Sequence, residues 1–271
     1  MVKEIDDLSK SNKILNIYMS LDRCPVGVKY LNSKEEYDSI QASVRKTKVT
    51  YCNSVNLASR GEKLKLLKGH QACIGGSTAL GFEKYNEDML SGKTRLKREN
   101  YADLETSKSV SDEMKFNDNY IYGVLVSPID KMEVEPDVII VIGKSYNIMR
   151  LIQGYSYNYG YATSIKTVGL QAICHDLTTA PIISDSVNIS FLCPGTRLVA
   201  DWQPDEIGIG ISFSKWYKTV QGVVSTTNAF VRNDEKEKII KKLDDNGMDS
   251  NHIKLNQNYD TGLYKGGLAE I

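Results

Sequence analysis

The segment Pro136-Asp137-Val138-Ile139-Ile140-Val141-Ile142-Gly143 is followed at once by Lys144-Ser145-Tyr146-Asn147-Ile148-Met149-Arg150-Leu151. Its unbroken apolar run is typical of a strand buried on both faces, and the segment after it predicts a helix. The same order occurs earlier, where 26–31 predicts a strand and 32–37, with a capping serine, predicts a helix. The chain therefore begins a second strand–helix unit near residue 136.

The two units share a pattern of cysteines. Cys52 and Cys174 each follow the first strand and helix of their unit, and Cys73 and Cys193 come 21 and 19 residues later. A glycine lies two residues after each second cysteine, and a further predicted strand follows it. Strand–helix echoes arise by chance in any α/β chain, so the paired cysteines are what favours a true duplication.

We therefore predict an α/β protein built from two pseudo-twofold related strand–helix repeats with mixed sheets. The first repeat covers 20–132 and contains a charged insertion at 84–119, which is either a lid or an exposed connecting helix. The second repeat covers 133–225. An amphipathic helix at 1–19 precedes the repeats, and a C-terminal helix and tail at 226–271 follow them.

The composition argues against several classes of partner. The 271 residues contain 34 Lys and Arg against 34 Asp and Glu, so no net charge attracts nucleic acid or an anionic membrane surface. The longest apolar runs, of about five residues, are far shorter than the roughly 20 that cross a bilayer. The first residues lack the apolar core of a secretory signal, so we expect a cytoplasmic location. The balanced charge is compatible with a homo-oligomer without requiring one.

Four of the five cysteines occupy matching positions of the two repeats, so a pseudo-twofold axis would bring them to one site. In a reducing compartment, four thiolates favour zinc or an iron–sulfur cluster over disulfides, although small buried thiols that only pack are the alternative. Zinc ribbons need two cysteines separated by two residues, and this sequence has no such pair. Long separations beside Gly75, Gly76 and Gly195 suit a larger cofactor, because glycine permits its close approach. The predicted cofactor is a [4Fe-4S] cluster, with the metal ligands Cys52, Cys73, Cys174 and Cys193.

Two histidines and two arginines are further candidates for the site. His70 precedes Cys73 by three residues and His175 directly follows Cys174, so either histidine can serve as a ligand or carry protons. Asp176 can orient the ring of His175. Arg60 and Arg197 can hold an anionic substrate, although salt bridges within the fold are the commoner role of such residues.

Three functions remain open at this point, and the sequence does not decide whether the protein is an enzyme. The first is a cluster-binding protein that acts by redox chemistry, or through an open iron on a small molecule, with a small-molecule substrate or a redox protein as partner. The second is a metal-free module that binds a small anion while its cysteines only pack. The third is a thiol-dependent enzyme. Cys24 has no counterpart in the second repeat and is left outside the predicted site.

Several motifs together resemble domain-of-unknown-function family 169. They lie at 24–29, 51–62, 70–81, 136–138, 149–155, 169–174 and 188–197, and they include His70-Gln71-Ala72-Cys73-Ile74-Gly75-Gly76 and Leu192-Cys193-Pro194-Gly195-Thr196-Arg197. The resemblance covers about residues 20–225. That family is uncharacterised and common among anaerobic bacteria and archaea, so the resemblance implies no reaction. It implies that the four paired cysteines occupy the characteristic positions of the family.

Overall fold

Strand β4 (Val138–Lys144) lies at the centre of the protein in the computed structural model, which describes residues 5–255. Its side chains alternate between two separate apolar cores, one on each face of the sheet. Val138, Ile140 and Ile142 face one core, and Ile139 and Val141 face the other. The strand is therefore buried on both faces, as its apolar run predicts.

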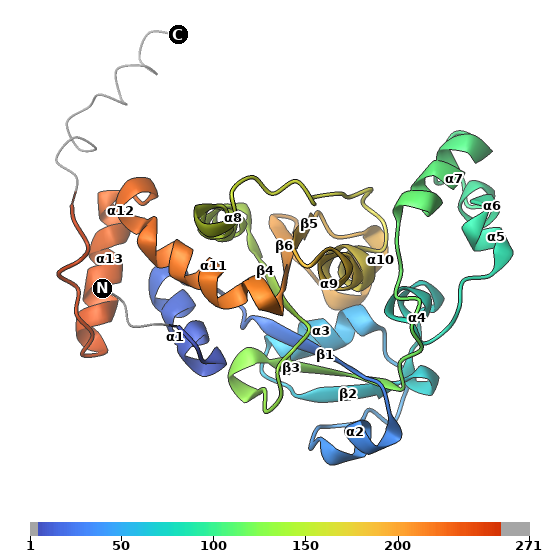
Figure 1. The fold of residues 1–271 in the computed structure, drawn as a ribbon, viewed down its shortest axis with the longest axis horizontal. Helices are drawn as coiled ribbons and strands as arrows, with labels where there is room; N and C mark the ends of the chain where they lie inside the picture. Colours follow the sequence, from blue (N-terminus) through green and yellow to red (C-terminus); the bar gives the residue numbers. More distant parts are fainter. Residues whose placement is uncertain (1–4, 256–271) are drawn as a thin grey trace, which may run out of the picture.

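The strands form one six-stranded sheet in the order β2-β3-β1-β4-β6-β5, and all five pairings are antiparallel (Figure 1). Counted outward from the centre, each half contributes its first, third and second strand, so the two halves have the same strand order. The α/β class is confirmed, and this order agrees with the predicted repeats. Instead of mixed sheets there is a single antiparallel one, because the halves join through the antiparallel pair β1–β4. The other strands are β1 (Val26–Leu31), β2 (Leu64–Leu67), β3 (Gly123–Pro128), β5 (Val187–Ser190) and β6 (Glu206–Ser212).

Helices cover both faces of the sheet. One face packs against α1 (Leu8–Met19), α8 (Ser145–Tyr159), α11 (Phe213–Ser225) and α13 (Asn233–Asp245). The opposite face packs against α3 (Tyr51–Ser59), α4 (Ile74–Leu80), the π-helix η3 (Ala172–Thr179) and α10 (Pro194–Ala200). Every paired cysteine lies on or next to an element of this second group. The remaining short helices are α2 (Lys34–Ser39), η1 (Lys68–His70), η2 (Ile129–Lys131), α9 (Ala180–Ser184) and α12 (Thr227–Phe230).

Glycines let the helices approach the sheet and each other closely. On β6, Gly208 and Gly210 face η3, and a Cβ atom at Gly210 would lie 2.1 Å from the carbonyl oxygen of Leu177. On the other face, a Cβ atom at Gly222 of α11 would lie 2.0 Å from the carbonyl oxygen of Gly154 in α8. The alternation of glycine and isoleucine in β6 therefore lets η3 lie directly on the sheet.

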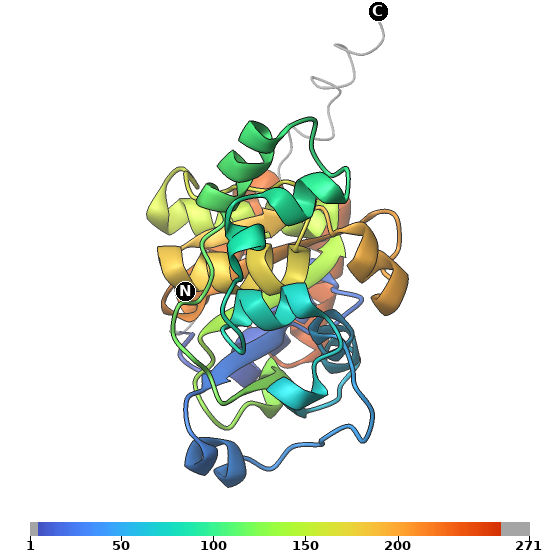
Figure 2. The same ribbon diagram turned by 90° about the vertical axis from the view of Figure 1, so that its right-hand side faces the viewer.

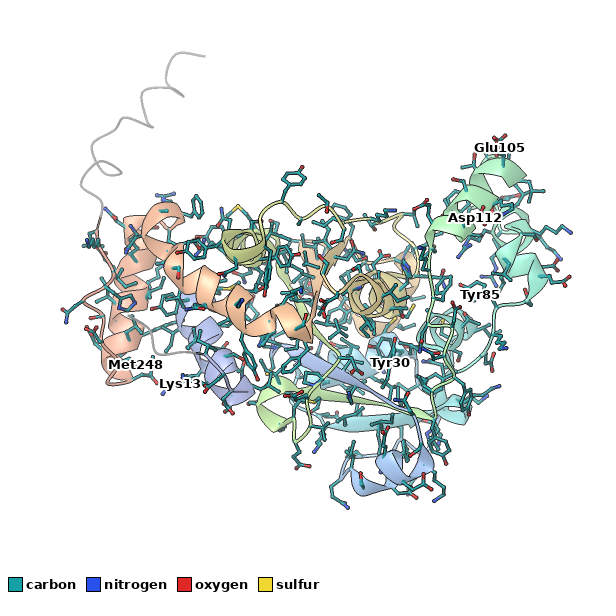
Figure 3. The ribbon with its side chains drawn as sticks, viewed as in Figure 1. Lys13, Tyr30, Tyr85, Glu105, Asp112 and Met248 are labelled. Carbon is teal, nitrogen blue, oxygen red and sulfur yellow. The ribbon has the colours of Figure 1, made fainter. Side chains whose placement is uncertain are left out.

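The charged insertion projects from the sheet as three helices (Figure 2, in which it is green). These helices are α5 (Glu87–Leu90), α6 (Lys93–Lys97) and α7 (Leu104–Glu113), so the insertion is helical as predicted. Figure 3 shows Glu105 and Asp112 on α7 at the outer end of the molecule and Tyr85 closer to the sheet.

The first and last helices of the described residues belong to the same face of the sheet as α8 and α11. The predicted N-terminal helix is α1 and the predicted C-terminal helix is α13, whereas the part of the predicted tail beyond residue 255 lies outside the described residues. Within residues 5–255, each helix is too short or too polar to cross a membrane.

Candidate metal centre

The four paired cysteines come from four segments on the same face of the sheet. Cys52 lies in the first turn of α3, Cys73 directly precedes α4, Cys174 lies within η3, and Cys193 directly precedes α10. Helix α3 contacts both η3 and α10, and α4 contacts η3. Residues far apart in the sequence are therefore brought to neighbouring positions.

The thiols are close enough to interact electrostatically. Burial raises the pKa of Cys174 well above its usual value, and the neighbouring thiols of Cys52, Cys73 and Cys193 raise it further. Burial likewise raises the pKa of Cys52 to about 12, with added contributions from Cys193 and Cys73. The fold thus places the four cysteines of the predicted site on one face of the sheet, where Cys52, Cys73 and Cys193 are near enough to affect the pKa of Cys174.

Cys24 lies apart from this group. Its thiol contacts Asn12 Oδ1 of α1 at 3.8 Å and Asp130 Oδ1 of η2 at 3.7 Å. Burial raises its pKa to about 11, and the charge of Asp130 adds to the shift. This fifth thiol therefore lies outside the group, as the sequence predicts.

The four thiols are not gathered around a single point. Among residues 5–255, no three His, Cys, Asp or Glu side chains are arranged to hold one metal ion. Their exposure also differs, because Cys174 is 4% exposed whereas Cys73 is exposed and Cys52 and Cys193 are partly buried. The group is therefore enclosed at Cys174 and open to solvent at Cys73.

Gln71 and two glycines shape the surroundings of Cys73. The side-chain oxygen of Gln71 accepts hydrogen bonds from the backbone N–H groups of Tyr51, at 3.0 Å, and of Cys73, at 3.3 Å. Because these donors fix the oxygen, the Nε2 amide points elsewhere, and it is buried without a hydrogen-bond partner among the described residues. A Cβ atom at Gly76 would lie 3.5 Å from Nε2 and 3.7 Å from Cys73 Cβ, and one at Gly75 would lie 3.9 Å from Cys73 Sγ. A buried N–H donor without a partner among the described residues therefore lies near Gly76 and Cys73.

Thr196 supplies a second donor, at Cys52. The buried hydroxyl of Thr196 accepts a hydrogen bond of 3.0 Å from the indole N–H of Trp202. A hydrogen bond between Thr196 and Cys52 lowers the pKa of the thiol and partly offsets the effect of burial. Because the indole can only donate, the hydroxyl proton of Thr196 is free to point at the sulfur.

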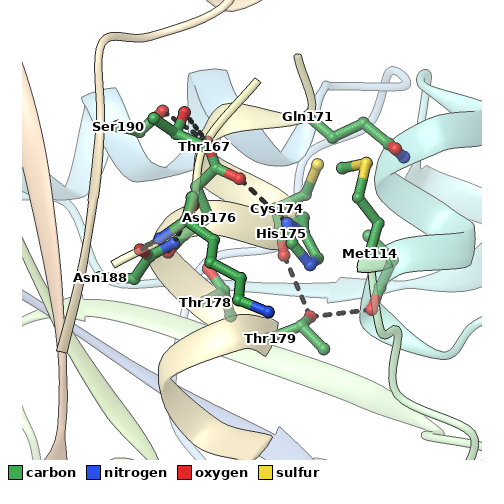
Figure 4. Close-up of polar contacts among 12 residues, drawn as sticks. Met114, Thr167, Gln171, Cys174, His175, Asp176, Thr178, Thr179, Asn188 and Ser190 are labelled. Atoms are coloured by element: carbon green, nitrogen blue, oxygen red, sulfur yellow. Dashed lines mark hydrogen bonds and ion pairs between the residues drawn. The ribbon is translucent and has the colours of Figure 1, made fainter. Parts of the chain in front are cut away.

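A His–Asp pair directly follows Cys174 on η3. His175 Nδ1 lies 2.9 Å from Asp176 Oδ1, and both side chains are buried. The other carboxylate oxygen of Asp176 accepts hydrogen bonds from the hydroxyls of Thr167, at 2.9 Å, and Ser190, at 3.0 Å. Figure 4 shows Asp176 between His175 and these hydroxyls. The carboxylate thus orients the imidazole, as predicted from the sequence.

The other candidates have structural contacts. His70 Nδ1 accepts the backbone N–H of Leu67 at 3.4 Å within the turn η1. Arg60 is exposed and donates to Asn56 Oδ1 at 3.2 Å. The guanidinium of Arg197 donates to three backbone carbonyls, those of Phe191, Gln203 and Glu206, at 2.8 to 3.0 Å. Gly195 is exposed and a Cβ atom there would meet open space.

Gln171 and Arg95 are residues that the sequence analysis missed. Gln171 Nε2 donates to the hydroxyl of Tyr85 at 2.8 Å and to the carbonyl of Gly75 at 3.3 Å. Its Oε1 accepts a 2.8 Å hydrogen bond from the buried guanidinium of Arg95, which also donates to the hydroxyl of Ser111. These bonds fasten the insertion to η3 and α4. A signal was available, because Gln171-Ala172 repeats the dipeptide Gln71-Ala72 near a cysteine.

Comparison with known proteins agrees with the motifs. Residues 14–222 match the model of the family described as uncharacterised ArCR, domain of unknown function 169. The chain is also similar to the uncharacterized protein MJ0308 of Methanocaldococcus jannaschii, with 27% identity over 226 residues that cover 81% of this chain and 95% of the relative. No solved structure matches the chain. The matched segment contains all four grouped cysteines and all six strands, and the chain therefore belongs to the uncharacterised ArCR family, domain-of-unknown-function family 169.

Proposed function

We propose that this protein binds a [4Fe-4S] cluster through Cys52, Cys73, Cys174 and Cys193. The observation that carries the proposal is the convergence of four thiols from four segments on one face of the sheet, where the neighbouring thiols add to the raised pKa of Cys52 and Cys174. Thiolates are the ligands that iron–sulfur clusters use. If the thiols served only for packing, exposure of one of them would have no purpose, yet Cys73 is exposed.

The spread of the thiols favours a cluster over a single ion. Zinc holds each thiolate at about 2.3 Å, which places the four sulfur atoms roughly 3.8 Å apart. A four-iron cluster binds each cysteine to a different iron and therefore needs ligands that are further apart. The thiols of Cys52, Cys73 and Cys193 affect the pKa of Cys174, yet no three ligands in the described residues are arranged around one ion, so we favour a cluster over a single zinc ion.

Two hydrogen-bond donors next to the ligands fit a cluster. Gln71 Nε2 is buried beside Cys73 with no partner in the described part of the chain, and the hydroxyl of Thr196 reaches Cys52. Donors to cysteine sulfur or to bridging sulfide stabilise the bound cluster and help to set its reduction potential. A bound sulfur atom would give the amide of Gln71 the acceptor that it lacks.

The raised pKa values disfavour Cys52 and Cys174 as the nucleophile of a thiol enzyme. An attacking cysteine needs a lowered pKa, whereas burial raises that of Cys52 to about 12 and that of Cys174 well above its usual value. The anion-binding hypothesis is weakened because Arg197 already donates to three backbone carbonyls. Metal binding displaces the thiol protons, so cluster assembly should be favoured as the pH rises.

Cys73 is the ligand most open to solvent, so we place exchange with a redox protein or a small molecule on its side of the cluster. His175, held by Asp176 beside Cys174, is the candidate for carrying protons. The five free thiols suit a reducing compartment, and we therefore propose a cytoplasmic location.

The test is the metal content of protein purified without oxygen. We expect about four iron and four sulfide per chain and an electron-paramagnetic signal after reduction. Replacing any one of the four ligands with Ala should lower the iron content, whereas the matched control Cys24→Ala should keep it. A colourless, metal-free protein of native stability would contradict the proposal, as would an equal loss of iron in the Cys24→Ala control.

A further inference from the structure

An open cavity of about 990 Å³ lies beside the insertion. Its walls come from the C-terminal end of α4, from the start and end of the insertion, and from α9. Cavities of this size bind small molecules in many proteins. The cavity is distinct from the cysteine group, because none of the four cysteines lines it.

Three exposed apolar side chains line the cavity. Leu90 is 53% exposed, Tyr120 is 64% exposed and Ile183 is 48% exposed. They belong to three separate segments of the chain, namely α5, the connection before β3, and α9. Exposed apolar side chains that gather in one hollow from different segments indicate a surface that a ligand covers.

One wall of the cavity is aromatic and leads towards the His–Asp pair. The rings of Tyr85 and Phe116 are stacked, with centroids 4.3 Å apart and planes 20° from parallel. The ring of Phe116 in turn lies 5.3 Å from that of His175. A stacked aromatic wall suits a ligand with a flat ring. The hydroxyl of Tyr85 accepts a hydrogen bond from Gln171, which directly precedes η3, and this bond fixes the position of the aromatic wall.

The charges around the cavity favour an anion. The lining contains three lysines, Lys68, Lys84 and Lys115, and two carboxylates, Glu83 and Asp118. Lys68 pairs with Glu83 at 3.4 Å, whereas Lys84 and Lys115 form no ion pair with any residue in 5–255. Three lysines against two carboxylates, beside exposed apolar side chains, complement a molecule with an apolar body and an acidic group.

We propose that this cavity binds a small organic anion that carries a flat ring. The ring lies on the Tyr85–Phe116 wall and covers Leu90, Tyr120 and Ile183, while the acidic group meets Lys84 and Lys115. Binding of such a molecule is independent of the metal centre. Phe116 and His175 lie between the cavity and the cysteine group. A further role of the bound molecule as a substrate of the metal centre would rest on the proposed function.

The test uses two fluorescent probes with the full-length protein. The anion 1-anilinonaphthalene-8-sulfonate and the neutral N-phenyl-1-naphthylamine share the same ring system and differ by the sulfonate. The double variant Leu90→Ser with Tyr120→Ser should weaken the binding of both probes by at least about fivefold. Lys84→Gln with Lys115→Gln should weaken only the anionic probe, by about threefold or more, and high salt should mimic this effect.

Leu198→Ser is the matched control, because Leu198 is 85% exposed on α10 and does not line the cavity. Unchanged affinity of both probes in the Leu90 and Tyr120 double variant would overturn the proposal, as would an equal loss in the control. Unchanged binding of the anionic probe after removal of both lysines would overturn its anionic part. Iron content is measured on the same samples, so that failure of the cavity proposal can be distinguished from failure of the metal centre. The variant Cys52→Ala should lose iron and still bind both probes.

Discussion

Adding one methyl group at Gly210 of β6 should separate η3 from the sheet. A Cβ atom there would lie 2.1 Å from the carbonyl oxygen of Leu177 and 2.7 Å from its Cα atom. Ordinary van der Waals contact begins near 3.4 Å, so the strand and the helix would have to move apart by more than about 1 Å. Both partners are backbone, and no change of rotamer relieves the contact. We expect Gly210→Ala to lower the free energy of unfolding by about 3 kcal/mol, the upper end of the usual range for overpacking.

Urea denaturation measures this loss directly, and Gly143→Ala on the paired strand β4 is the control. A Cβ atom at Gly143 would meet nothing closer than Asn147 Cβ at 3.6 Å, so its substitution should change the free energy of unfolding by less than about 0.5 kcal/mol. Because η3 carries Cys174, Gly210→Ala should also lower the iron content of anaerobically purified protein. Equal midpoints for the Gly210 variant and the wild type would refute the close packing of η3 on β6.

Three further outcomes follow from individual side chains. Thr196→Val removes the acceptor of the buried indole N–H of Trp202 and should cost about 1–3 kcal/mol in urea denaturation; no loss would mean that the bond contributes nothing. In cluster-free protein, burial raises the pKa of Cys52 from 9.0 to about 12, so the neutral thiol stabilises the fold below pH 9 and this contribution is lost as the pH rises towards 12. Cys52→Ala should therefore reduce the fall of unfolding free energy above pH 9 by up to about 1.4 kcal/mol per pH unit, and an unchanged slope would contradict it. Hydrogen bonds from Lys215 and Ser214 lower the pKa of Asp185 to about 2, so its contribution is present above about pH 4 and lost on acidification. Because Asp185 is 57% exposed, Asp185→Asn should cost less than about 1 kcal/mol at pH 7 and a smaller amount near pH 2, which unfolding at the two pH values measures.

The central strands were predictable from the sequence because their side chains are buried on both faces. β1 and β4 occupy the segments that their apolar patterns predict. The edge strands β2 and β5 were missed, because each has only four residues and pairs on one side. Short edge strands owe their conformation to the neighbour that they pair with, and local sequence carries little of that information.

The π-helix η3 was not predictable either, for a different reason. It begins after Gln171, which adopts a left-handed backbone conformation with φ of 50°. The hydroxyl of Thr178 donates to the carbonyl of Ile173, five residues earlier, at 2.6 Å. The helix also depends on the glycines of β6, which lie far away in the sequence and allow it to sit on the sheet. The pairing of cysteines was visible in the sequence, whereas Gln71, Thr196 and Arg95 have roles that only the packing reveals.

The sheet topology explains why paired cysteines in the sequence meet in space. The two halves have the same strand order and join at the antiparallel pair β1–β4, which is consistent with a pseudo-twofold axis perpendicular to the sheet that places equivalent segments on the same face. Within each half, the first cysteine precedes the edge strand and the second follows it, so each half contributes two thiols to that face.

The departures from this symmetry explain why the cysteine group is buried at Cys174 and exposed at Cys73. Only the first half carries the insertion, whose Arg95 and Tyr85 hydrogen-bond to Gln171, and in the second half Cys174 lies within the buried helix η3. The symmetric part of the fold therefore supplies the four cysteines of the group. The asymmetric parts enclose the group at Cys174, leave it open to solvent at Cys73, and form the cavity beside the insertion.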